Sequence, residues 1–358
     1  MEKYEEARVY LVTATELQPK YVLALTILGL FYEITGEEME SEKYLEEAAK
    51  VHKATTNDDN PATIMIKAAE FLVQVHATKI ADSALSNSLV KTGPSVSPYL
   101  LLSQLEIQRG NPLIAMENIK SAMAVRQDDP DVWAVLGHLQ FRQRVWGEAQ
   151  NSYETVLSLP NESSNMPLIY MRLGFLYLRS LGNITKKVSE RTYAEVELAR
   201  KAKTMYIRAC EIKPCSSSWL GVAKASILLG QYEEAEDSLS EANVLNNRDS
   251  EVWAYLALLC LILDRQFEAG QCISQAIRNK IKNPDVLRLV GNAFLESNQP
   301  APAVECFRMT LELDPKDAAT KALFTKAISL QSQDYLKSQF GPGATAVVGE
   351  GAPEISAI

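Results

Sequence analysis

Small residues and bulky apolar residues recur along this chain with a period of about 34 residues. Two runs of small residues keep this spacing: Ala69, Ser103 and Gly137, then Ala223, Ala257 and Gly291. An alanine follows each of them at a constant distance, and a bulky apolar residue follows each alanine by four. Apolar positions three, four and seven residues apart are typical of amphipathic helices. The pattern therefore predicts a series of two-helix repeats joined by tight turns.

The small residues are expected where the two helices of a repeat cross most closely, because a larger side chain there would separate the backbones. The positions assigned to these crossings are Gly29, Gly137, Gly174, Gly291, Ala115, Ala149, Ala235, Ala269 and Ala303. Gly36, Gly110 and Gly230 stand seven residues after the small position. A left-handed residue is expected to end the first helix of the repeat there.

This pattern resembles the tetratricopeptide repeat family over nearly the whole chain. The motif is almost complete in one repeat, through Leu287, Val290, Gly291, Phe294, Ala303, Phe307 and Pro315. The resemblance implies an all-α fold, an α-solenoid of tetratricopeptide helical hairpins wound into a right-handed superhelix. Such repeats present an extended surface to other proteins.

Four parts are expected along the chain. Residues 1–19 would be the second helix of an incomplete repeat, residues 20–315 eight repeats, residues 316–340 a C-terminal capping helix, and residues 341–358 a disordered tail. A basic insertion near residues 181–200 is expected to lengthen a second helix or to form a protruding loop. The opening in mid-repeat predicts that the chain is part of a longer protein.

Composition and charge restrict the possible partners. The chain is 47% apolar with a formal charge of −9, and no basic stripe offsets its carboxylates, so nucleic-acid binding is not expected. The longest apolar stretch, from Val252 to Leu263, is too short to cross a bilayer and predicts a buried helix. The acidic amino terminus does not resemble a signal peptide. The five cysteines are expected to be reduced thiols of a cytoplasmic protein.

The sequence contains no constellation typical of catalysis. Its three histidines, His52, His76 and His138, fall in different repeats and have no second metal ligand three or four residues away. A glycine-rich phosphate loop and a nucleophile elbow are both absent from the sequence. We therefore expect no enzymatic activity, no metal, no cofactor and no small-molecule substrate.

The resemblance implies that partners bind a concave groove lined by the first helix of each repeat. The groove positions expected here are Leu30, Glu70, Gln104, His138, Phe175, Lys224, Leu258, Arg288 and Asn292. A partner would bury a helix or an extended segment there, although apolar positions at helical spacing often serve packing instead. Chaperone-binding members of the family hold a peptide carboxylate with several Lys, Asn and Arg side chains. Only Arg288 and Asn292 resemble a piece of that set.

The segment from Cys215 through Leu263, which contains SSSWLGVAKASILLGQYEEAEDSLSEANVLNN, resembles the carboxy-terminal repeat arrays of the cilia- and flagella-associated protein 70 family. The resemblance implies a scaffold in the axoneme of motile cilia and flagella that organises or anchors motility complexes, such as dynein arms or central-apparatus components. Its partners would be axonemal subunits. A chaperone adaptor and a scaffold subunit of a multi-protein enzyme such as a ubiquitin ligase remain alternatives.

Overall fold

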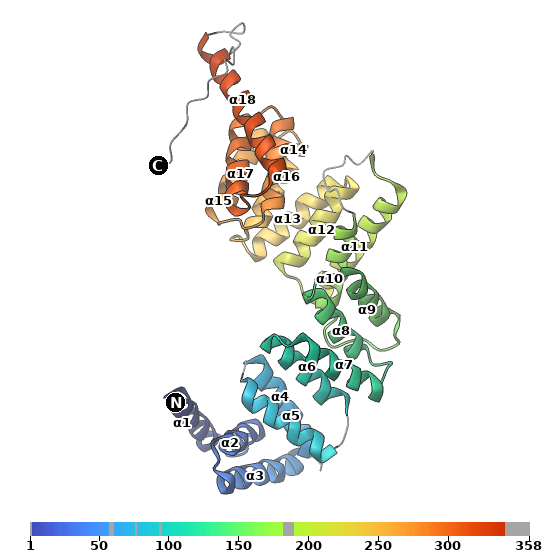
Figure 1. Cartoon of the computed structure of the whole chain (residues 1–358), viewed down its shortest axis with the longest axis vertical. Coiled ribbons are helices and arrows are strands. Elements are labelled where there is room, and N and C mark those ends of the chain that lie inside the picture. The colour runs from blue at the N-terminus through green and yellow to red at the C-terminus, as the bar shows by residue number, and fades with distance from the viewer. Residues whose placement is uncertain (1, 57–60, 76, 93–94, 182–189, 341–358) are drawn as a thin grey trace. The chain divides into compact units, whose positions relative to one another are not determined.

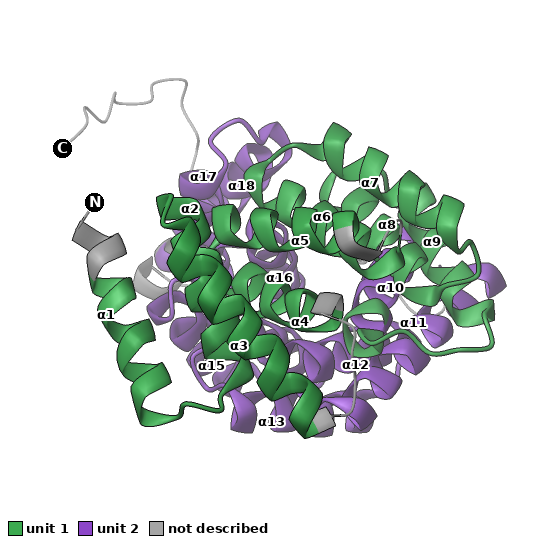
Figure 2. Ribbon diagram, turned by 90° about the horizontal axis from the view of Figure 1, so that it is seen from below, with its two compact units in different colours: residues 1–169 green, residues 170–358 purple. Residues whose placement is uncertain are grey.

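The computed structural model of the chain describes residues 2–56, 61–75, 77–92, 95–181 and 190–340. Eighteen α-helices and no β-strand are present within these ranges. Figure 1 shows how the helices follow one another along the chain. The chain divides into two compact units, Met1–Ile169 and Tyr170–Ile358, which Figure 2 colours separately. The expected all-α fold class is confirmed. The expected tail and residues 182–189 of the expected insertion lie outside the described residues.

The first unit consists of consecutive helical hairpins. Its helices are α1 (Glu2–Leu17), α2 (Val22–Thr35), α3 (Glu38–Thr56), α4 (Pro61–Gln74), α5 (Thr78–Thr92), α6 (Val96–Arg109), α7 (Pro112–Val125), α8 (Pro130–Arg142) and α9 (Trp146–Ser158). The most extensive contacts join α2 to α3, α4 to α5, α6 to α7 and α8 to α9. Each of these pairs is one repeat of the pattern. The boundary between the units falls within α10 (Met166–Ser180).

The second unit continues the same architecture. Its remaining helices are α11 (Tyr193–Ile212), α12 (Ser216–Leu229), α13 (Tyr232–Leu245), α14 (Ser250–Ile262), α15 (Gln266–Arg278), α16 (Pro284–Glu296), α17 (Pro300–Leu313) and α18 (Ala318–Phe340). Helices α12 and α13, α14 and α15, and α16 and α17 form hairpins, while α18 packs against α17. The tetratricopeptide hairpins expected from the sequence therefore occur in both units.

Helix α11 is longer than its counterparts and starts inside the expected insertion. It has 20 residues, whereas α13, α15 and α17 have 13 or 14. Its start is fixed by a reciprocal capping box. The Thr192 hydroxyl accepts from the backbone N–H of Glu195 at 3.3 Å, and the Glu195 carboxylate accepts from the backbone N–H of Thr192 at 2.7 Å. The described part of the insertion thus supplies the first turns of a second helix.

Where the small position of a hairpin is a glycine, a bulky side chain of the second helix lies directly on it. A Cβ atom on Gly137 would stand 2.7 Å from Tyr153 Cε1, and one on Gly291 would stand 2.8 Å from Phe307 Cε1. Only a glycine leaves room for such aromatic rings. The alanines Ala115, Ala149, Ala235, Ala269 and Ala303 are all 0% exposed. The bulky side chains therefore cover the crossing points themselves and do not only fill the spaces between them.

A single tyrosine joins three helices of the second unit. The ring of Tyr206 in α11 lies against Gly174 of α10 on one side and Gly221 of α12 on the other. A Cβ atom at Gly174 would stand 2.8 Å from Tyr206 Cε2. The sequence pattern indicated Gly174 but missed Gly221, because Gly221 lies two residues before the repeating small position.

The turns between paired helices use a left-handed residue at a fixed position. The expected C-terminal caps Gly36, Gly110 and Gly230 have φ values of 84°, 83° and 75°. These expectations are confirmed. The equivalent residues of three other hairpins are Arg144, Asp264 and Asn298, with φ values of 63°, 58° and 54°. Because these three residues are not glycines, the sequence did not predict left-handed turns at them.

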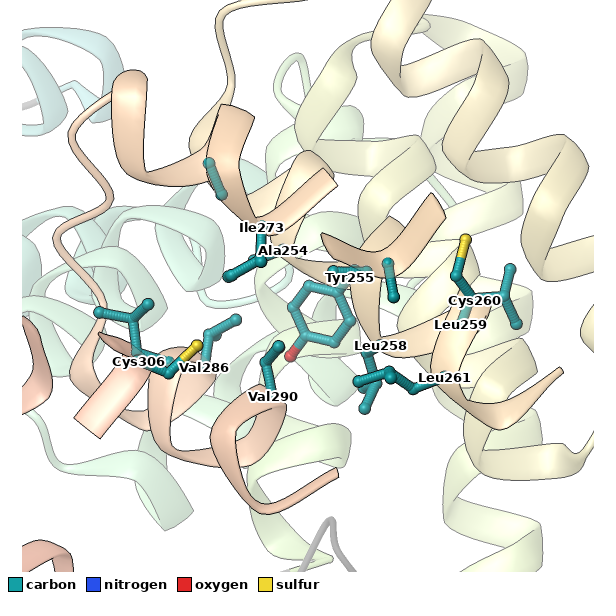
Figure 3. Packing of buried hydrophobic residues seen from close by; sticks show 14 of the residues in the cluster. Ala254, Tyr255, Leu258, Leu259, Cys260, Leu261, Ile273, Val286, Val290 and Cys306 are labelled. Carbon is teal, nitrogen blue, oxygen red and sulfur yellow. The ribbon is translucent and has the colours of Figure 1, made fainter. Parts of the chain in front are cut away.

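The second unit has a continuous hydrophobic core that includes side chains from α12 through α18. Figure 3 shows labelled members of this core: Tyr255 and Leu258 of α14, Ile273 of α15 and Val290 of α16. The apolar stretch that predicts a buried helix is α14, as expected. None of the helices in the described ranges is both long and apolar enough to traverse a membrane.

Candidate protein-binding surface

The nine expected groove residues all lie on the first helices of hairpins, from Leu30 on α2 to Asn292 on α16. Their burial differs widely. The exposed ones are Glu70, Gln104 and Phe175, and the half-buried ones are His138, Lys224, Arg288 and Asn292. Leu30 and Leu258 are buried, at 0% and 6% exposed, and belong to hydrophobic cores. These two side chains offer almost no surface to a partner.

His138 is held by the tyrosine that closes its own hairpin. Its Nδ1 atom lies 2.8 Å from the hydroxyl of Tyr153, and the two ring centroids are 5.5 Å apart. Tyr153 is itself fully buried. The imidazole is therefore oriented by the α8–α9 hairpin.

Lys224 takes part in a charged network that links three successive first helices. Its Nζ donates to Glu251 Oε2 of α14 at 3.0 Å and lies 4.7 Å from the ring centroid of Tyr255. The other carboxylate oxygen of Glu251 accepts from Asn283, just before α16, at 2.9 Å. The sequence pattern indicated Lys224 but not Glu251 or Asn283, because neither falls on a position of the repeat that was assigned to the groove.

Opposing effects set the pKa values of this network. Burial favours the neutral amine of Lys224, but Tyr255 and Glu251 outweigh it, so the pKa of Lys224 is raised. Burial likewise favours the protonated form of Glu251. The charge of Lys224 and the hydrogen bonds from Asn283 and Lys224 outweigh burial, and the pKa of Glu251 is lowered. Both groups are charged at neutral pH, and the network ties α12, α14 and the start of α16 together.

Arg288 is engaged by carboxylates of its own chain. Its Nη1 donates to Asp317 Oδ2 at 2.8 Å, and its Nη2 donates to Asp285 Oδ1 at 2.7 Å. Hydrogen bonds from Thr320, together with Arg288, lower the pKa of Asp317 to about 2. A peptide carboxylate would have to displace these partners. The geometry therefore does not favour a chaperone-type carboxylate clamp at Arg288.

The described residues contain no group of three His, Cys, Asp or Glu side chains that could hold a metal ion. Cys210, Cys215, Cys260, Cys272 and Cys306 are free thiols. Burial raises the pKa of Cys306 to about 12, so its thiol stays protonated at neutral pH.

Comparison with known proteins relates the hairpins to one family. The family model described as the cilia and flagella-associated protein 70 C-terminal domain matches residues 100–341, which is more than half of the chain. The chain belongs to this family. The resemblance stated from the sequence is confirmed, as is the tetratricopeptide repeat fold.

Two curated relatives carry the name cilia- and flagella-associated protein 70. The human protein is 37% identical over 227 residues, covering 63% of this chain and 19% of the relative. The protein of Macaca fascicularis is 42% identical over 135 residues, covering 38% of this chain and 12% of the relative. The chain thus spans about a fifth or less of the length of these relatives.

The crystal structure of the APC/C hetero-tetramer Cut9-Hcn1 is a structural neighbour. It aligns with a TM-score of 0.54 and 13% sequence identity, covering 90% of this chain and 59% of that chain. At this identity the likeness concerns the fold alone.

Proposed function

We propose that this chain is a non-catalytic protein-binding scaffold in the axoneme of motile cilia and flagella. It organises or anchors motility complexes such as dynein-arm or central-apparatus components, and its partners are axonemal subunits. Membership of the cilia- and flagella-associated protein 70 family carries this proposal.

The surface chemistry supports protein binding along the first helices. Helix α10 exposes Phe175, whose side chain is 41% accessible, and α4 and α6 expose Glu70 and Gln104. An exposed aromatic side chain such as that of Phe175, which belongs to the second unit, is typical of positions that anchor protein partners. We propose these three residues as contacts, while Lys224 and Arg288 tie successive helices together.

Proximity labelling of the tagged chain in ciliated cells tests the proposal. We expect labelled axonemal proteins that stay with the axoneme after high-salt extraction. A variant with Glu70→Ala, Gln104→Ala and Phe175→Ala should lose part of this labelling. The control Leu113→Ala with Val244→Ala alters exposed apolar positions on second helices and should not.

Labelling confined to the cell body would contradict the axonemal assignment. Binding of acidic chaperone-tail peptides that Arg288→Ala abolishes would instead indicate a chaperone adaptor.

A further inference from the structure

A groove of 580 Å³ lies within the first unit among helices α2, α3, α4 and α5. Its apolar floor includes Leu45 of α3 together with Ile64 and Met65 of α4. Ile64 and Met65 are nearly buried, at 5% and 4% exposed. None of the nine expected groove residues lines it. The groove is therefore lined by residues other than those nine.

The groove exists because the α4–α5 hairpin does not fully cover the α2–α3 hairpin. Leu45 lies on Gly29 and takes the bulky position of its repeat. The equivalent residues are at most 6% exposed in the other repeats: Leu85, Ile119, Tyr153, Tyr206, Leu239, Ile273 and Phe307. Leu45 is only half-buried. A position that is buried in the other repeats is therefore accessible from the groove at Leu45.

The length of the first repeat explains this difference. Gly29 and Ala69 stand farther apart than one period of the pattern, and α3 is 19 residues long. Of the two helices in the preceding hairpin, α4 packs more against α2 and makes few contacts with α3. By contrast, α6 and α8 pack against the second helix of the hairpin before them. The longer repeat therefore leaves a space beside α3.

The edge of the groove is acidic. Glu38, Glu42 and Glu46 line it at intervals of four residues, so they share one face of α3, and all three are exposed. Glu46 pairs with Lys50 at 3.1 Å, but both side chains are more than half exposed, and such a pair contributes little. The groove therefore combines an apolar floor with a row of carboxylates one helical turn apart.

We infer that this groove binds a short amphipathic helix of a partner protein, with lysine or arginine residues at intervals of four and a bulky apolar residue on the same face. The basic side chains pair with Glu38, Glu42 and Glu46, and the apolar residue covers Leu45. Charge complementarity selects this occupant. A second copy of this chain, with a formal charge of −9, would be repelled. The inference rests on the proposed scaffold function and names one class of its partners.

Fluorescence anisotropy with the full chain tests the inference. The probe is a labelled helical peptide of about 15 residues with lysines every four residues and leucines on the same face. The groove variant carries Glu38→Gln, Glu42→Gln and Glu46→Gln. The matched control carries Glu233→Gln, Asp237→Asn and Glu241→Gln, three exposed acidic residues at the same spacing on α13.

We expect the groove variant to raise the Kd about tenfold, the combined effect of three exposed ion pairs. The control should change it less than about twofold. Ala49→Trp, which introduces an indole beside the floor, should also weaken binding while leaving the carboxylates in place. A version of the peptide with glutamates for the lysines should not bind.

Three results would overturn the inference: equal weakening by both acidic variants, full binding to Ala49→Trp, or no binding up to about 1 mM. A change in sedimentation of the free chain on groove substitution would indicate a second copy as the occupant and would also overturn it. Proximity labelling reports separately on the scaffold function. Peptide binding without axonemal labelling would refute that function, and axonemal labelling without peptide binding would refute only the groove.

Discussion

The α2–α3 hairpin and the α16–α17 hairpin have the same register of small and bulky residues but differ in how they are closed. In both, a bulky residue of the second helix lies on a glycine of the first, Leu45 on Gly29 and Phe307 on Gly291. Phe307 is 0% exposed, whereas Leu45 is half-buried beside a groove. Contact within the hairpin is therefore not sufficient to bury this position.

The neighbouring helix makes the difference. Helix α18 packs along α17, and its Ala327 belongs to the same core as Phe307. Helix α4 makes few contacts with α3. A stacked repeat array buries its core only where each unit is covered by the next. A change in repeat length thus converts a core position into a candidate binding position.

Removing the bulky residue should have the largest effect and should separate the two hairpins. Phe307→Ala deletes a fully buried ring and should destabilise α16–α17 by about 3–5 kcal/mol. Leu45→Ala removes a half-buried side chain and should cost about 1–2 kcal/mol. Hydrogen exchange of the amides in each hairpin measures both, because repeat arrays open locally. Equal losses of stability in the two hairpins would show that Leu45 is packed as tightly as Phe307 despite the groove.

Adding a methyl group under the bulky residue should have the next largest effect. Gly291→Ala places a Cβ atom 2.8 Å from the enclosed ring of Phe307, and we expect a loss of about 1–2 kcal/mol after the gain in helix propensity. Gly29→Ala places a Cβ atom 2.7 Å from Leu45 Cγ and 3.2 Å from the backbone nitrogen of Leu45. The side chain has room to move toward the groove, and the gain in helix propensity offsets the remaining tight contact with the backbone. The effect of Gly29→Ala should stay within about 0.5 kcal/mol of zero. Urea unfolding of both variants tests the contrast.

The sequence predicted the hairpins well because their register depends on local spacing. A glycine such as Gly137 and a bulky residue such as Tyr153 meet whenever two helices of fixed length are joined by a tight turn. The left-handed turn at Gly110 follows from the same local geometry. The family was also indicated by residues of these hairpins.

The sequence could not predict features that depend on how one repeat covers the next. The groove at Leu45 arises from the extra length of α3, which has 19 residues. The repeat pattern at Leu45 is the same as in the closed hairpins. The network of Lys224 with Glu251 and Asn283 joins positions that belong to successive repeats. Its members become neighbours only through the stacking of α12, α14 and α16. The burial of Leu258 likewise depends on that stacking.

Loosening the end helix should make the last hairpin resemble the first. Asp317 accepts from the backbone N–H groups of Ala319 and Thr320 at 3.0 and 3.2 Å and binds Arg288 of α16. Asp317→Ala should therefore cost about 1 kcal/mol and speed hydrogen exchange in α18. Asp317→Asn keeps a side chain that can cap α18 and should lose less stability than Asp317→Ala.

The pH dependence of this cap has a definite sign. The pKa of Asp317 is lowered from its ordinary 3.8 to about 2, so its stabilising effect is complete above about pH 5 and is lost as the pH falls through 2. The wild-type chain and Asp317→Ala should thus converge in stability at low pH. A difference that is as large at pH 2 as at neutral pH would contradict the role of the carboxylate.

The smallest expected effect concerns the turn of each hairpin. The left-handed position is Gly36 in the first hairpin, with φ 84°, and Asn298 in the last, with φ 54°. Asn298→Gly removes a side chain that the left-handed region disfavours, but glycine also loses more entropy on folding. The free energy of unfolding should therefore rise by about 0.5 kcal/mol. Gly36→Asn should cost about the same. Thermal unfolding of the two variants should show opposite shifts, and shifts of the same sign would mean that the turns differ in more than the residue they carry.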